Sequence, residues 1–423
     1  MVAFYRLDVR QIWLQFLREP LYFWMLCGYI VVEYVRPQSI IPALDVLPWA
    51  KVFLSFALIG LLSDRRVRWV ADSANTLMTT FLFVILLASA FAIYPQVSWS
   101  KWFDFVGWFV IYFLIIHIVS TEKRFFIVLV IFLLASFKLS FFGARTWAMR
   151  GFAFTNWGIA GPSGPFQNSG ELSIQMLMFA PIAYQAALAL RPYLSRTKHF
   201  LLLLFPITAA MTVIGASSRG AQLGLGYQLY RCLLKGRLSL RTLLVAAIVA
   251  GTAFAFLPEE QKDRFTSAGK DDTSVQRLLY WQRGLDMLED HPLLGVGFYN
   301  FAPYFQDNYP QDVLRGAAQL PHNIFIQVGT DAGLLGLGVF LALLYRNFRC
   351  CREIRRICLS GGRDEAFASR IALGLIIALW GFVIAGQFVS VAYYPFFWMN
   401  LAMSVALLNV VKRENPNTRD VGP

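Results

Sequence analysis

Two pairs of polar residues lie where long apolar segments begin, and together they could move a proton and hold an anion. His322 and Asn323 open the apolar stretch LPHNIFIQVGTDAGLLGLGVFLALLYR. A histidine titrates near neutral pH and can act as a general base. Ser218 and Arg219 open another apolar segment, where an arginine opposes the helix dipole unless an anion binds with it. We interpret these positions as a candidate base and a candidate anion site.

A further arginine lies between these two segments, in the stretch DDTSVQRLLYWQRGLDMLED. Its periodicity predicts an amphipathic helix that lies on the membrane or on the protein surface, with an apolar stripe formed by Val275, Leu278, Leu279 and Leu285. Arg277 and Trp281 are four residues apart and share another face. Arg283 projects about 120° from Arg277 on a straight helix, and we expect it to pair with Asp286. Arg277 is therefore the second candidate anion ligand.

Each of these residues also has a purely structural interpretation. Asn323 could cap a helix, His322 could be an interfacial polar residue, and Arg219 could be a snorkelling arginine. The helix that carries Arg277 could be a plain surface helix, and Tyr299 could belong to an interfacial aromatic belt. The glycines of these segments are expected to be packing positions in helix contacts; they are Gly220, Gly224, Gly226, Gly329, Gly333 and Gly336.

The elements that must position these residues are membrane helices. The chain of 423 residues is 57% hydrophobic and only 15% charged. Apolar segments long enough to cross about 30 Å of hydrocarbon recur throughout, and membrane spans without a barrel pattern must be helical. We predict an all-α polytopic membrane protein with about twelve transmembrane helices, over residues 21–36, 43–62, 75–93, 103–120, 125–143, 171–190, 199–216, 221–234, 239–257, 322–345, 370–389 and 393–411.

The distribution of charge predicts the topology. Most of the 38 basic residues fall in alternate connecting segments, which places both termini in the cytoplasm. The organisation we expect is an interfacial segment at 1–20, nine transmembrane helices over 21–257, a large periplasmic loop with amphipathic helices at 258–321, helices ten to twelve over 322–411, and a cytoplasmic tail at 412–423. The segment Arg346–Arg370, with Cys350, Cys351 and Cys358, is expected to be a solvated basic loop, and a contact with anionic lipid is the alternative.

The sequence contains no pattern for a metal or a nucleotide. It has four histidines, no HExxH, no Asp-x-Asp and no phosphate-binding glycine loop. We therefore expect no cofactor and no metal, so that arginines must neutralise any anionic substrate.

In combination, these segments resemble the bacterial O-antigen ligase and polymerase superfamily of membrane glycosyltransferases. His322-Asn323, nine residues and then Gly333-x-x-Gly336 fit the family's tenth-span motif in full. Ser218-Arg219-Gly220 resembles its Ser-Arg segment, and SVQRLLYW…HPLLGVG resembles its extracytoplasmic loop. The front half is similar to the exosortase-associated O-glycosylation ligase branch.

The resemblance implies a GT-C-like enzyme of the bacterial inner membrane. Such an enzyme transfers glycan from undecaprenyl diphosphate to a lipid A–core sugar hydroxyl at the periplasmic face, with inversion. His322 would be the base, and Arg219 and Arg277 would hold the diphosphate. The further substrate-binding candidates are Ser218, Asn323, Trp281, Tyr299, and, in the loop after the fifth span, Arg145 and Arg150.

Other functions use similar features. An O-antigen or exopolysaccharide polymerase, or a protein O-oligosaccharyltransferase, would need the same arginines and histidine with a different acceptor. A lipid-linked glycan transporter is the alternative from another class. Transporters usually carry ionisable groups near the middle of the membrane, whereas the predicted spans hold few, chiefly Lys138 and Glu33.

Overall fold

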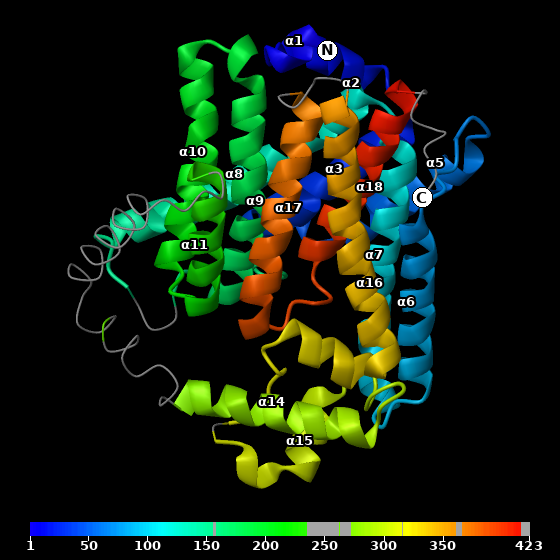
Figure 1. The fold of residues 1–423 in the computed structure, drawn as a ribbon, viewed down its shortest axis with the longest axis vertical. Helices are drawn as coiled ribbons and strands as arrows, with labels where there is room; N and C mark the ends of the chain where they lie inside the picture. Colours follow the sequence, from blue (N-terminus) through cyan, green and yellow to red (C-terminus); the bar gives the residue numbers. More distant parts are fainter. Residues whose placement is uncertain (155–157, 235–261, 263–271, 315, 361–365, 416–423) are drawn as a thin grey trace.

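The computed structural model describes residues 1–154, 158–234, 262, 272–314, 316–360 and 366–415. These residues form helices and connecting loops, without a strand. Figure 1 shows a bundle of long helices with α1 (Val2–Tyr5) and α2 (Val9–Leu17) at one end and α14 (Asp272–Asp290) across the other. The chain is a polytopic α-helical membrane protein, as the composition predicts.

Among the residues that the structure describes, eight helices are long and apolar enough to span a membrane. They are α6 (Ser73–Ala90), α7 (Pro95–Ile118), α8 (Glu122–Met149), α9 (Ser169–Leu190) with η2 (Arg191–Tyr193), α10 (Arg196–Gly215), α16 (Ile324–Ser360), α17 (Phe367–Ala385) with η4 (Gly386–Phe388), and α18 (Pro395–Glu414).

Three other expected spans form shorter helices, namely α3 (Leu21–Val35), α5 (Trp49–Ser63) and α11 (Arg219–Leu233), each of 15 residues. The short elements α4 (Pro37–Ile40) and η1 (Pro42–Leu44) connect α3 to α5. The expected span 239–257 lies outside the described residues. The exact number of twelve spans therefore stays a prediction.

Small side chains permit the closest contacts in the bundle. A Cβ at Gly224 of α11 would lie 3.2 Å from the carbonyl oxygen of Gly381 in α17, and the amide of Gln228 donates a 2.7 Å hydrogen bond to the Leu177 carbonyl in α9. Gly224 is therefore a packing glycine, as expected. The same expectation is wrong for Gly226, because a Cβ there would meet no atom within 4 Å.

The helix α16 differs from the prediction at its C-terminal end. It continues to Ser360, well beyond the expected end at residue 345. Arg346 forms an ion pair of 2.5 Å with Asp72, and the three cysteines of the expected loop are buried: Cys350, Cys351 and Cys358. The expected solvated loop is wrong over residues 346–360, because the basic side chains alternate with apolar ones that pack into the bundle.

Gly333 breaks α16 near its start. Its backbone angles are φ 65° and ψ −168°, a conformation that is open almost only to glycine. In an unbroken helix the Leu334 N–H would bond to the Thr330 carbonyl. Here the Thr330 carbonyl accepts from the Val296 N–H at 2.8 Å, and the Leu334 N–H donates to the Pro292 carbonyl at 2.7 Å. The backbone of the loop segment 292–296 thus replaces the partner of both the donor and the acceptor of one helical hydrogen bond.

The same segment is tied to the rest of the bundle. The Ile93 N–H donates to the Val296 carbonyl at 3.0 Å, and Asn300 exchanges hydrogen bonds with the backbone of Tyr94. Beyond it, α15 (Phe301–Asn308) and η3 (Pro310–Asp312) complete the described part of the large loop. The loop is therefore fastened both to α16 and to the turn between α6 and α7.

The face by which α14 packs on the bundle is not its leucine stripe. Its buried residues are Tyr280, Gly284 and Met287, whereas Leu278 and Leu285 are exposed. A Cβ at Gly284 would lie 2.4 Å from the side chain of Ile326 in α16. The small glycine allows this close approach, so the leucines are turned away from the bundle.

Substitution of Gly333 by alanine should destabilise the fold. The backbone conformation alone costs a non-glycine residue about 1–3 kcal/mol, and the new Cβ would lie 2.2 Å from the backbone of Leu293. We expect Gly333→Ala to lower the midpoint of thermal unfolding in detergent. Gly338→Ala is the matched control, because a Cβ there meets no atom within 4 Å. Equal midpoints for the two variants would contradict this account of the break.

Candidate active site at the end of the bundle

The first candidate anion ligand, Arg219, joins two elements. Ser217 has a left-handed backbone with φ 57°, Ser218 is the N-cap residue, and α11 begins at Arg219, as expected. The Arg219 Nη2 donates a hydrogen bond of 3.2 Å to the Ser274 Oγ in the first turn of α14. The start of α11 and the start of α14 are therefore adjacent, although 55 residues separate these two side chains.

The candidate base, His322, lies in a short segment held at several points. Its own backbone is left-handed with φ 53°, and its N–H donates to the Ser390 Oγ at 2.7 Å. The Trp281 Nε1 donates to the carbonyl of Pro321 at 3.0 Å. The His322 Nε2 lies 3.2 Å from the Gln319 Oε1. If this oxygen is the acceptor, the neutral ring carries its proton on Nε2 and its lone pair on Nδ1.

Arg277 and His322 influence each other electrostatically. Burial lowers the pKa of His322, and the positive charge of Arg277 lowers it further, to about 4. Both causes disfavour the imidazolium ion. The imidazole is therefore neutral at pH 7, which is the form that can accept a proton. Since Arg219 bonds to Ser274, one turn before Arg277 on α14, the structure brings together all three residues that the sequence selects.

Asn323 has a clear structural role. Its Oδ1 accepts hydrogen bonds from the N–H groups of Phe325 at 2.9 Å and of Ile326 at 3.2 Å, and so caps α16. The capping interpretation is confirmed, and a contact of Asn323 with substrate stays a prediction.

Phe388 connects the segments that the sequence selects, although no signal in the sequence identifies it. Its ring centroid lies 6.3 Å from that of Trp281. A Cβ at Gly220 would lie 2.5 Å from the Phe388 side chain. Gly220 therefore allows η4 to reach between α11 and α14, and the packing role expected of this glycine is confirmed. Ser274, Gln319 and Ser390 are the other residues at the site that sequence reasoning missed.

The two secondary arginines lie in different surroundings. Arg145 is inside α8 rather than in the outside loop, because α8 continues to Met149. Arg150 follows α8, and its Nη1 donates to the Gly158 carbonyl at 3.3 Å. A Cβ at Gly158 would meet the Ala216 carbonyl, just before the Ser218-Arg219 segment. Arg150 is thus linked through Gly158 to the segment that precedes Ser218 and Arg219, whereas Arg145 is an exposed residue of a helix.

The candidate Tyr299 and the two phenylalanines that follow it, Phe301 and Phe305, belong to packed hydrophobic clusters. Tyr299 packs edge-on against Phe298 and lies 5.6 Å from the ring of Tyr393, and burial raises the pKa of its phenol. Phe301 and Phe305 are fully buried. These contacts explain why the rings are present without invoking a sugar, so that stacking of a sugar on Tyr299 stays a prediction.

Arg283 pairs with Asp286 as expected, at 3.0 Å, and it also pairs with Asp312 at 2.7 Å. Its guanidinium lies 4.8 Å from the centre of the Tyr309 ring. These partners belong to the large loop, which makes Arg283 a structural residue of that loop and a suitable control for Arg277.

The arrangement defines a class of protein: a membrane protein with a neutral histidine and two arginines gathered at one end of its bundle. Within the described residues, no group of three His, Cys, Asp or Glu side chains could hold a metal ion. Residues 203–341 match the model of a family described as O-antigen ligase. This match supports the O-antigen ligase and polymerase superfamily, whose members are glycosyltransferase-like ligases and polymerases. No curated protein matches the sequence.

The electrostatic influence of Arg277 on His322 can be measured directly. Removal of the positive charge in Arg277→Gln should raise the pKa of His322 from about 4 toward its usual 6.5. Of the two protonation states of an imidazole, diethyl pyrocarbonate modifies only the neutral one. Mass spectrometry of the His322 peptide after modification at a series of pH values therefore reports this pKa. Arg283→Gln should leave the profile unchanged. A profile that is identical in wild type and Arg277→Gln would show that the two groups do not interact.

Proposed function

We propose that the protein is an O-antigen ligase of the bacterial inner membrane. In this proposal it transfers glycan from undecaprenyl diphosphate to a hydroxyl of lipid A–core, and the end of the bundle that carries α14 faces the periplasm. The observation that carries the proposal is the convergence of neutral His322, Arg277 and Arg219 from three separate segments of the family-matched region.

The proposed reaction requires one proton transfer and one displacement. A ring nitrogen of His322 accepts the proton of the acceptor hydroxyl as its oxygen attacks the anomeric carbon. The bond from that carbon to the diphosphate oxygen breaks, and undecaprenyl diphosphate leaves with the electron pair. Attack opposite to the leaving group inverts the anomeric centre.

The leaving diphosphate needs positive partners. Arg219 and Arg277 would supply planar guanidinium groups that suit phosphate oxygens, and the first N–H groups of α11 would add a helix N-terminus. A bound diphosphate also offsets the charge of Arg277 near His322. The pKa of His322 would then rise from about 4, which makes it a stronger base once the donor is bound.

Substitution of the three residues tests the proposal. We expect His322→Ala to lower transfer by about 10²–10⁴-fold, because a general base is lost. Arg219→Ala and Arg277→Ala should also be strongly impaired, and lysine at either position should restore activity only in part, since an ammonium lacks the planar fork. The measurement is the restoration of long-chain lipopolysaccharide in a strain from which the gene has been deleted.

Arg283→Ala is the control for these substitutions. It removes an arginine from the same helix and should retain most of the activity, because its partners Asp286 and Asp312 belong to the loop rather than to the site. If the deletion strain keeps normal lipopolysaccharide but makes a shortened exopolysaccharide or an unglycosylated protein, the acceptor is that glycan or that protein rather than lipid A–core. Full activity of His322→Ala would exclude a general-base role.

Metal independence is a separate expectation. If arginines alone neutralise the diphosphate, transfer by the purified protein should persist in EDTA. Loss of transfer in EDTA that magnesium or manganese restores would show that a cation takes part in holding the donor.

A further inference from the structure

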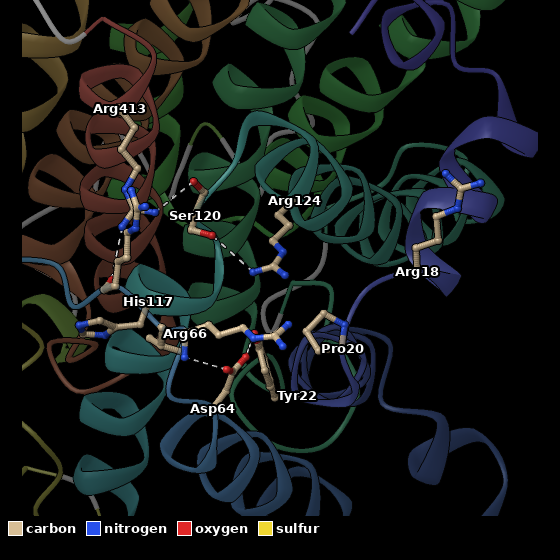
Figure 2. Close-up of a pocket in the computed structure, with 11 residues that line it drawn as sticks. Arg18, Pro20, Tyr22, Asp64, Arg66, His117, Ser120, Arg124 and Arg413 are labelled. Atoms are coloured by element: carbon tan, nitrogen blue, oxygen red, sulfur yellow. Dashed lines mark hydrogen bonds between the residues drawn. The ribbon is translucent and has the colours of Figure 1, made fainter.

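A basic cavity lies at the opposite end of the bundle from the candidate active site, and the proposed reaction does not use it. Its volume is ≈ 520 Å³. It is formed by the end of α2, the start of α3, the segment after α5, and the ends of α7, α8 and α18 (Figure 2). The residues that line it include five arginines and one carboxylate, namely Arg18, Arg66, Arg68, Arg124, Arg413 and Asp64.

Two carboxylates, Asp64 in the lining and Glu19 in an ion pair with Arg124, do not balance the five arginines. Asp64 accepts hydrogen bonds from the Arg66 N–H at 2.9 Å and from the Tyr22 hydroxyl at 3.0 Å. The adjacent cavity offers a contrast, since it is lined by three glutamates with Lys123 and Arg124, so that its charges nearly cancel. An excess of positive charge is therefore particular to the first cavity.

Two of the arginines are held in place by the protein. The Arg124 Nε pairs with Glu19 at 2.5 Å, and its Nη1 donates to the Ile118 carbonyl at 3.0 Å. The guanidinium of Arg413 donates to the carbonyls of Ser120 at 3.5 Å and of Arg68 at 3.3 Å. Figure 2 shows the side chains of Arg66 and Arg124 reaching into the same space from different elements. Planar guanidinium groups fixed around one space suit a phosphate group.

The surroundings of the cavity are apolar where a membrane would lie. The helix α2 begins with Val9 and exposes Trp13, Leu14 and Leu17, and Leu21 is exposed at the start of α3. The outer surface of α5 exposes Phe56, Ile59 and Leu62. A helix with exposed tryptophan and leucine next to arginines is typical of a segment in the membrane interface.

We propose that this cavity binds a phosphate group, and that an anionic phospholipid of the adjacent leaflet supplies it. The headgroup phosphate lies between Arg66 and Arg124, whose side chains reach into the same space (Figure 2), and the other arginines that line the cavity add positive charge around it. The acyl chains lie against the apolar surfaces of α3 and α5. The bound lipid joins the interfacial helix α2 to the ends of α8 and α18. Inorganic phosphate could make the same contacts with the arginines, but it has no acyl chains to pack against the apolar surface.

The test uses the full-length protein purified in neutral detergent. Binding of phosphatidylglycerol and of phosphatidylcholine is measured by native mass spectrometry, and the shift of the unfolding midpoint is measured with each lipid and with inorganic phosphate alone. The pocket variant is Arg18→Gln/Arg66→Gln/Arg68→Gln. The control variant is Arg65→Gln/Arg191→Gln/Arg196→Gln, which removes the same charge from exposed arginines outside the cavity.

We expect wild type to bind and be stabilised by phosphatidylglycerol and not by phosphatidylcholine. The pocket variant should bind phosphatidylglycerol on the order of 100-fold more weakly, since each arginine near an anionic surface contributes a factor of roughly five. The control variant should bind like wild type. If the pocket variant unfolds, Arg66→Gln against its neighbour Arg65→Gln gives the same comparison with one charge.

Two results would overturn the proposal. Equal weakening in the pocket and control variants would show that binding reflects overall charge rather than this cavity. Stabilisation by inorganic phosphate equal to that by phosphatidylglycerol, and lost in the pocket variant, would assign the cavity to a soluble phosphate compound instead of a lipid.

Discussion

The exchange of hydrogen bonds at the break in α16 is the interaction on which the candidate site depends. In an unbroken helix the Leu334 N–H would donate to the Thr330 carbonyl. Here both groups form hydrogen bonds with the backbone of residues 292–296 instead. Because buried backbone groups must be paired, the break in the helix and the attachment of the loop require each other. The conformation of Gly333 makes the exchange possible, and the exchange in turn fixes where α14 can lie.

Once α14 is fixed, packing across small residues places the rest of the site. The side chain of Ile326 packs over Gly284, and the side chain of Phe388 packs over Gly220. The ring of Phe388 also lies next to that of Trp281. Trp281 in turn bonds to the carbonyl of the residue before His322. His322 and the two arginines therefore lie on separate elements that share one packed interface. A displacement of α14 would move Arg277 relative to both Arg219 and His322.

Charge is organised differently at the two ends of the bundle. At the candidate active site, a histidine is buried beside an arginine and kept neutral, which prepares it to accept a proton. At the other end, arginines surround an open cavity beside exposed apolar helices. Arginine thus lowers the pKa of a histidine at one end and supplies positive charge around a cavity at the other. The effect of the charge differs because the burial and the neighbouring groups differ.

The sequence by itself determined the helical membrane class, because apolar segments of that length have few other stable structures. It also selected His322 and Arg219, which stand out at the starts of apolar segments, and Arg277, which stands out on the amphipathic helix between them. It could not show that α14 packs on the bundle through Tyr280, Gly284 and Met287, nor that α16 continues past residue 345. It also gave no sign of Phe388, Ser390 or Gln319 at the site. These features arise from contacts between segments far apart in the chain, which local periodicity does not encode and which only the tertiary structure decides.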